Sequence, residues 1–211
     1  MGETHNKIIA ATAKVEIGLL GFRRKGRSRL WLADHGSWLN VVEFTPSRWS
    51  KGVSLMNAVH WLWAGHGFLS LNLAIPSKFH AEFETEDQFG NAATNIAREA
   101  ATKALELEKT FSSFEATAKF VVDRARGSDR MRPSWWGYQA GMASGMQNSF
   151  DDAEWFLRGV SDQRVTVHAA ALLPLIDRPA NFRSKVNELV ARQRAALKLP
   201  ALDRHPFDVR I

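Results

Sequence analysis

The stretch SRLWLADHGSWLNVVEF, residues 28–44, predicts a β-hairpin. Runs rich in tryptophan, valine and leucine flank the tight-turn sequence DHG, which is typical of two antiparallel strands. Pro46 should end the second strand, because proline cannot donate to a sheet ladder. A second hairpin is expected from strands over 53–63 and 68–75, and a short strand over 79–83 would close an edge of the sheet.

The hydrophobic period then changes from two residues to between three and four. This spacing predicts a long amphipathic helix over 87–109, followed by helices over 111–122 and 182–197. Another helix, over 4–20, precedes the strands and should end at Gly21. The sequence DDAE, residues 151–154, fits an N-terminal capping box.

This order of elements predicts an α+β fold, with an antiparallel sheet of about four to five strands. An N-terminal helix and several C-terminal helices would pack on that sheet. We expect a single domain over 1–211. A helix plus the sheet would occupy 1–85, a helical part 86–200 and an irregular tail 201–211.

Composition excludes several classes of protein. The chain has 211 residues, of which 45% are hydrophobic and 24% charged, as in soluble globular proteins. It has no cysteine, which excludes disulfides, thiolate zinc sites, iron–sulfur clusters and a cysteine nucleophile. Lys14 interrupts the apolar N-terminal run, and the weakly polar run 53–75 contains His60 and His66. We therefore predict a cytoplasmic protein with no membrane segment and no cofactor.

The net charge of +6 is concentrated at the two ends of the chain. Residues 1–33 carry seven Lys or Arg against two acids, and residues 178–211 carry eight against three, so each end is +5. Residues 82–177 carry ten against fifteen, a net charge of −5. Such a field bears on association and solubility rather than on the fold.

A basic turn, FRRKGR over 22–27, is the first candidate site. Several converging cations are what binding to a phosphate backbone requires, and exposed tryptophans would add stacking surfaces for single-stranded bases. The cations are Arg23, Arg24, Lys25, Arg27 and Arg29, and the neighbouring tryptophans are Trp31, Trp38 and Trp49. The simpler interpretation is a solvated turn whose arginines pair with the acidic stretch 82–87.

A second candidate is the loop Ser47-Arg48-Trp49. Arg48 could bind an anion with two parallel hydrogen bonds while Trp49 shields it from water. Alternatively, Ser47 is a turn residue and Trp49 packs over the end of the sheet. Loops concentrate binding residues, so we include these three in the tentative ligand-binding set.

Two weaker patterns concern metal binding and catalysis. A strand would align His80, Glu82 and Glu84 on one face, where they could ligate a divalent metal. We favour a solvent-facing edge strand instead, since alternating polar residues are what such a face needs. Glu43 interrupts an apolar strand and would be either solvated or a buried acid. No catalytic residue is assigned.

Glycines recur every four residues at Gly137, Gly141 and Gly145. On a helix they would form a smooth stripe, which predicts a close helix–helix contact in the core.

The N-terminal part of the chain resembles a bacterial family over residues 5–85. The carrying segments are GFRRKG at 21–26, the tryptophan-bearing hairpin, FTPSRW at 44–49 and LNL at 71–73. They resemble the bacterial domain of unknown function (DUF) 4304 family. The chain departs from that pattern at Thr45-Pro46, where a glutamine is common, and at Ala74, where a glycine is common. The resemblance implies a helix followed by a sheet, and it implies no activity.

The sequence thus predicts a non-enzymatic domain that binds an anionic ligand or partner, nucleic acid among them. One alternative is a metal-dependent hydrolase or nuclease that uses Glu43 or the strand at 80–84. A second alternative is a homodimer held by an exposed apolar surface rich in the eight tryptophans.

Overall fold

The computed structural model describes residues 4–46, 51–203 and 206–207. Within these residues the chain is α+β, with a five-stranded antiparallel sheet and seven α-helices. It divides into two compact units. Unit 1 comprises Met1–Trp61 and Leu69–Lys109, and unit 2 comprises Leu62–Phe68 and Thr110–Ile211. Unit 1 thus includes the long helix that follows the strands, up to Lys109, and the expectation of a single domain over 1–211 stays a prediction.

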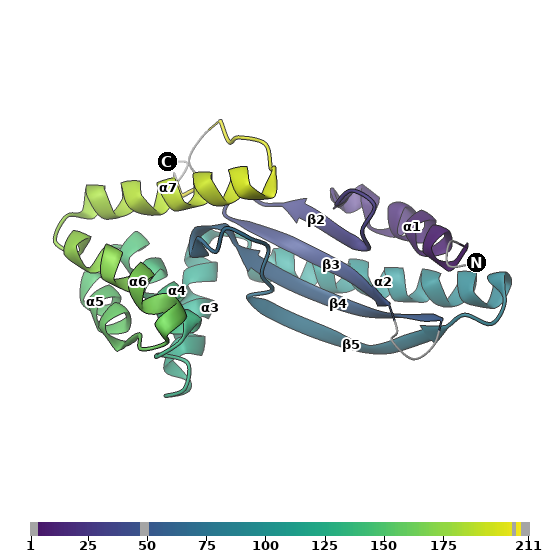
Figure 1. Cartoon of the computed structure of the whole chain (residues 1–211), viewed down its shortest axis with the longest axis horizontal. Coiled ribbons are helices and arrows are strands. Elements are labelled where there is room, and N and C mark those ends of the chain that lie inside the picture. The colour runs from purple at the N-terminus through teal and green to yellow at the C-terminus, as the bar shows by residue number, and fades with distance from the viewer. Residues whose placement is uncertain (1–3, 47–50, 204–205, 208–211) are drawn as a thin grey trace. The chain divides into compact units, whose positions relative to one another are not determined.

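Unit 1 is a meander in which every strand pairs with the next, in the order β1-β2-β3-β4-β5 (Figure 1). The strands are β1 Arg23–Arg24, β2 Leu30–Asp34, β3 Trp38–Pro46, β4 Gly52–Trp61 and β5 Leu73–Glu82. Two helices, α1 Thr4–Glu16 and α2 Glu86–Thr110, accompany them. The predicted hairpin is confirmed, with Leu30 opposite Glu43 and β3 ending at Pro46.

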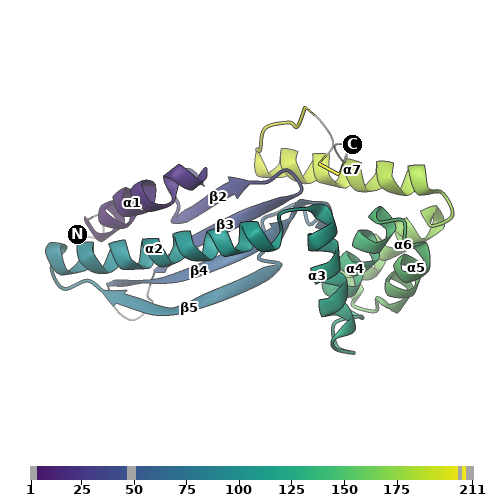
Figure 2. The ribbon, with the colours of Figure 1, turned by 180° about the vertical axis from the view of Figure 1, so that it is seen from behind.

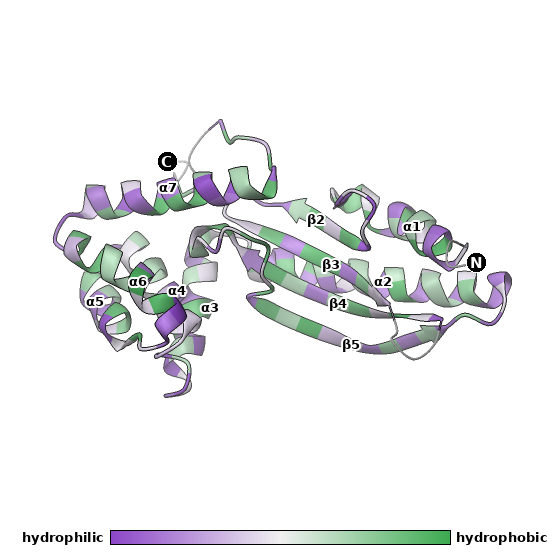
Figure 3. Ribbon diagram, in the orientation of Figure 1, coloured by the Kyte–Doolittle hydropathy of each residue, from purple (hydrophilic) through white to green (hydrophobic). Residues whose placement is uncertain are grey.

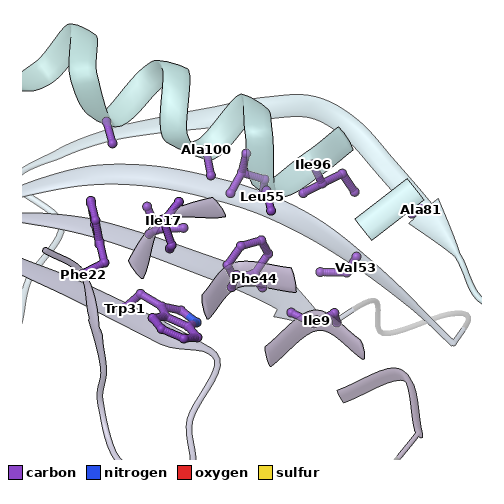
Figure 4. Packing of buried hydrophobic residues seen from close by; sticks show 14 of the residues in the cluster. Ile9, Ile17, Phe22, Trp31, Phe44, Val53, Leu55, Ala81, Ile96 and Ala100 are labelled. Carbon is purple, nitrogen blue, oxygen red and sulfur yellow. The ribbon is translucent and has the colours of Figure 1, made fainter. Parts of the chain in front are cut away.

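Both helices of unit 1 cover the same face of the sheet, as Figure 2 shows from behind. Figure 4 shows the resulting core, where Ile9 of α1, Ile17 just after α1 and Ile96 of α2 meet Phe44 and Leu55 of the sheet. Burial alternates along Val53–Asn57 of β4, whereas Trp38–Val42 of β3 and Asn57–Trp61 of β4 are buried throughout; Figure 3 shows the hydropathy of these strands. The periodicity predicted for 87–109 is thus confirmed in α2.

Two buried asparagines join the sheet to α2. Asn40 of β3 donates through Nδ2 to the Ala104 carbonyl at 3.0 Å, and Asn57 of β4 donates to the Ala100 carbonyl at 3.1 Å. Both alanines are fully buried, so the small side chains let the helix backbone approach the strands. Each amide therefore fixes the position of α2 along the sheet, in addition to filling space.

The prediction for the second hairpin was wrong in part. Residues 68–72 lie outside the sheet, and the stretch from 79 to 82 belongs to the same strand as Leu73, not to a separate one. Side chains replace the expected ladder, since Asn72 Oδ1 accepts from the Trp61 N–H at 2.8 Å. His60 Nδ1 likewise accepts from the Ser70 N–H at 3.3 Å.

Unit 2 is helical and is built around α4 Trp135–Met146, which is buried from Gly137 to Met146. The helices α3 Phe114–Arg126, α5 Phe150–Gly159, α6 Gln163–Leu172 and α7 Pro179–Leu197 pack around it. Three short 3₁₀ segments complete the chain, η1 Gly18–Leu20 in unit 1, and η2 Leu62–Ala64 and η3 Leu173–Leu175 in unit 2. The sequence did not predict α6.

The glycine stripe does mark close packing around α4. A Cβ on Gly141 would lie 2.7 Å from a Leu157 side-chain carbon of α5, and one on Gly145 would lie 2.4 Å from Phe182 of α7. The predicted capping box was wrong, because α5 begins at Phe150. Asn148, with φ +61°, ends α4 in a left-handed conformation, and the next residue, Ser149, is the N-cap of α5 in place of Asp151.

The short segment Leu62–Phe68, which lies between two strands of unit 1 in the sequence, belongs to unit 2. Gln193 of α7 is buried and accepts from the Gly67 N–H at 2.6 Å through Oε1, while its Nε2 donates to the Phe68 carbonyl at 2.8 Å. One side-chain amide thereby pairs with the loop as a neighbouring strand would.

Among the residues that the structure describes, none of the helices has the length and apolar composition needed to cross a bilayer.

Candidate anion-binding site

The basic turn is a fixed piece of backbone in unit 1. The Lys25 N–H donates to the Leu30 carbonyl at 2.8 Å, and the Ser28 N–H donates to the Lys25 carbonyl at 3.1 Å. Gly26 has φ +57°, a conformation that glycine adopts without strain. Arg23 and Arg24 form β1 and pair with Leu32 and Trp31 of β2. The four predicted cations of the turn are thus carried on ordered backbone.

The turn itself holds the side chain of Arg24. Arg24 Nε donates to the Ser28 carbonyl at 2.6 Å, and Nη2 donates to the Arg27 carbonyl at 3.0 Å. These bonds use two of the five N–H groups of a guanidinium, so three remain for another acceptor. Holding the plane in advance lowers the conformational entropy lost on binding an anion.

Helix α1 brings further groups to the turn. Asn6, Lys7 and Ala10 of α1 line a shallow hollow of about 440 Å³ together with Arg24 and Arg27. Three of these five residues are cationic, and none is acidic. Among the described residues that line it, this hollow is therefore cationic, and such a field attracts an anion.

Arg29 anchors α1 beside this hollow. Its Nε donates to Asn6 Oδ1 at 2.7 Å, and its Nη2 lies 2.9 Å from His5 Nε2. Since a guanidinium only donates, His5 Nε2 accepts and the ring is neutral. Burial lowers the pKa of His5, and the charges of Arg29 and Lys51 lower it further. Burial and the charge of Arg24 lower the pKa of Arg29.

The acidic stretch 82–87 does not neutralise the turn. Within the described parts of the chain, no aspartate or glutamate lies within 4.0 Å of the cationic nitrogens of Arg23, Arg24, Lys25 or Arg27. Arg23, Lys25 and Arg27 are exposed. The charge of the turn is therefore available to a ligand.

The expected stacking surfaces are absent from this turn. Trp31 and Trp38 are only 5% and 3% exposed, because both pack inside the protein. Their proposed role in stacking single-stranded bases was therefore wrong. The other candidate loop, Ser47-Arg48-Trp49, lies outside the described residues.

The metal-binding pattern is broken at its third residue. His80 Nε2 lies 3.7 Å from Glu82 Oε1, and His80 Nδ1 lies 3.0 Å from Ser54 Oγ. However, β5 ends at Glu82, so the expectation that one strand face also carries Glu84 was wrong. In the described part of the chain no three histidine, aspartate or glutamate side chains form a group able to hold a metal ion. The favoured interpretation, an exposed edge strand, is confirmed for β5.

Glu43 is half-buried on the face of the sheet opposite the core. Its neighbours along the strand, Val42 and Phe44, both point into the core beneath α1 and α2.

No protein-family model, curated protein or solved structure matches this chain. The resemblance to the DUF 4304 family accordingly remains a prediction.

Sequence reasoning missed the contribution of α1 to the hollow. Asn6 and Ala10 are four residues apart and so share one face of a helix. That spacing identifies a common face, but nothing in the sequence shows that this face meets the turn at 25–28.

Proposed function

We propose that this chain binds a phosphate-bearing anion at the hollow between α1 and the basic turn. Lys7, Arg24 and Arg27 supply the charge, and the observation that carries the proposal is their convergence on one hollow, whose described lining residues include no acid. The absence of cysteine fits a reducing compartment, so we assign this binding to the cytoplasm.

The form of the site favours recognition of phosphate charge over recognition of bases. Arg24 is oriented in advance by two carbonyls, and guanidinium groups match phosphate oxygens with paired hydrogen bonds. Trp31 and Trp38 are buried, so neither of these two tryptophans offers a surface for stacking. Affinity should therefore depend on salt and little on base sequence.

The experiment is a salt series of fluorescence anisotropy with labelled duplex and single-stranded oligonucleotides. Each phosphate neutralised contributes about −0.9 to the slope of log K against log salt for duplex DNA. The variants Arg24→Gln and Arg27→Gln should each reduce that slope by about one and weaken binding uniformly across sequences. Inorganic pyrophosphate as a competitor distinguishes a compact phosphate ligand from a polymer.

The matched control is Lys78→Gln, which removes an exposed cation from β5, outside the hollow, and should leave the slope unchanged. Equal losses in Lys78→Gln and Arg27→Gln would show that net charge, not this hollow, causes the binding. Absence of binding to either oligonucleotide at low salt, together with no effect of pyrophosphate on the melting temperature, would overturn the proposal.

A further inference from the structure

A second hollow, of about 530 Å³, lies within unit 2 and differs chemically from the first. Its apolar lining comes from Phe114 at the start of α3, Met146 at the end of α4, and Phe207. Met146 and Phe207 are each 6% exposed, and the rings of Phe114 and Phe207 pack edge to face with centroids 4.6 Å apart. The hollow therefore has an apolar floor.

Polar side chains surround this floor. Arg183 of α7 and Glu115 of α3 bring one charge of each sign, and Gln147 and Asn148 bring two amides. In the part of the chain that the structure describes, none of these four side chains makes a hydrogen bond or an ion pair with another residue. Opposite charges that share one hollow without pairing with each other leave both available to a ligand.

We propose that this hollow binds a small zwitterion with an apolar side chain, such as an aromatic or large aliphatic α-amino acid. The carboxylate of the ligand pairs with the Arg183 guanidinium, a fork that matches two carboxylate oxygens. The ammonium pairs with the Glu115 carboxylate, and the side chain lies against Phe114 and Met146. A volume of about 530 Å³ is within the usual range for small-molecule sites.

The charge pattern explains why a zwitterion is favoured over a simple anion or cation. Glu115 repels a ligand that carries only negative charge, and Arg183 repels one that carries only positive charge. An internal peptide segment has neither charge, so it would leave both groups unpaired while removing them from water. This site is independent of the basic turn in unit 1, and either proposal can fail without the other.

The test is isothermal titration calorimetry, which measures the affinity of the full chain for L-phenylalanine and then for L-methionine and L-leucine. N-acetyl-L-phenylalanine lacks the ammonium and L-phenylalaninamide lacks the carboxylate, so each should bind at least tenfold more weakly. Arg183→Gln should lose discrimination against the amide, and Glu115→Gln should lose discrimination against the N-acetyl compound. The matched control, Arg192→Gln, removes an exposed cation of α7 that does not line the hollow.

Equal binding of L-phenylalanine and its two analogues would overturn the proposal. Absence of any heat of binding with all three amino acids would also overturn it, when each is added from 10-fold the protein concentration up to its solubility. The analogue series uses the unaltered protein, so it decides the question even if Arg183→Gln fails to fold. Circular dichroism of each variant identifies such a failure.

Discussion

The same substitution, glycine to alanine, should have opposite effects on two helices of this protein. At Gly145 of α4, a Cβ would lie 2.4 Å and 2.5 Å from two ring carbons of Phe182. Carbon atoms in contact are normally about 3.5–4.0 Å apart. Phe182 has no exposed surface and its ring also packs against Phe150, so it cannot move away freely.

The magnitude follows from two opposing contributions. Inserting a methyl group into a packed core costs about 1–3 kcal/mol, whereas alanine is favoured over glycine inside a helix by about 0.5–1 kcal/mol. Gly145→Ala should therefore lower the free energy of unfolding, by about 1 kcal/mol at the middle of these ranges and by at most about 2.5 kcal/mol. At Gly90 of α2 nothing lies within 4 Å of the added Cβ, so Gly90→Ala should raise it by about 0.5–1 kcal/mol.

Urea unfolding followed by circular dichroism measures both variants, and hydrogen exchange locates the change. Exchange should become faster in α4 and α7 for Gly145→Ala, and slower in α2 for Gly90→Ala. If Gly145→Ala raised the unfolding midpoint as much as Gly90→Ala does, the close approach of Phe182 to α4 would be refuted.

Three further predictions concern other contacts. Burial, and the nearby charge of His168, lower the pKa of His66 from its ordinary value of 6.5 to about 4, so between these two pH values the unfolded chain binds more protons than the folded protein. The contribution of His66 to the free energy of unfolding should be complete above pH 6.5 and should be lost as the pH falls towards 4. The loss should be about 2 kcal/mol after allowing for the partial exposure of the ring. Urea titrations at several pH values measure it, and His66→Phe should flatten this pH dependence. Asn57→Ala removes the bond to the Ala100 carbonyl and should cost about 1–2 kcal/mol in the same assay, and an unchanged midpoint would contradict the role given to that amide. Arg29→Lys replaces the two donating nitrogens, Nε and Nη2, by a single ammonium nitrogen, so amide exchange in α1 should accelerate while exchange in α2 stays constant.

Much of unit 1 could be predicted because its residues obey a single period. The spacing of Phe89, Ile96 and Ala104 identifies one helix face, and all three are buried in α2. The hairpin turn at DHG and the stop at Pro46 are local features, and both were predicted correctly. Local signals fail where a side chain from another segment decides, as when the side chains of Asn72 and His60 replace the ladder beyond Trp61.

Of the candidate site, the sequence predicted the basic turn but not the residues that α1 contributes. The cations of the turn are consecutive in the sequence, and so they could be found by composition. Lys7 and Asn6 join them only because α1 packs back on the sheet, which no local pattern encodes. Trp31 was expected to be an exposed stacking surface, but its strand parity directs it into the core with Phe44.

The hydrogen bonds between Gln193 and the segment Leu62–Phe68 limit how this protein can be divided into fragments. Unit 2 contains Leu62–Phe68 as well as the C-terminal helices, so neither unit is one continuous piece of chain. Cutting the gene after residue 109 would leave the loop at Gly67 without the amide that it meets 126 residues later. During synthesis on the ribosome that pairing must likewise wait until α7 has emerged. A fragment meant to reproduce unit 2 alone therefore needs its seven-residue segment supplied as a separate peptide or joined by circular permutation.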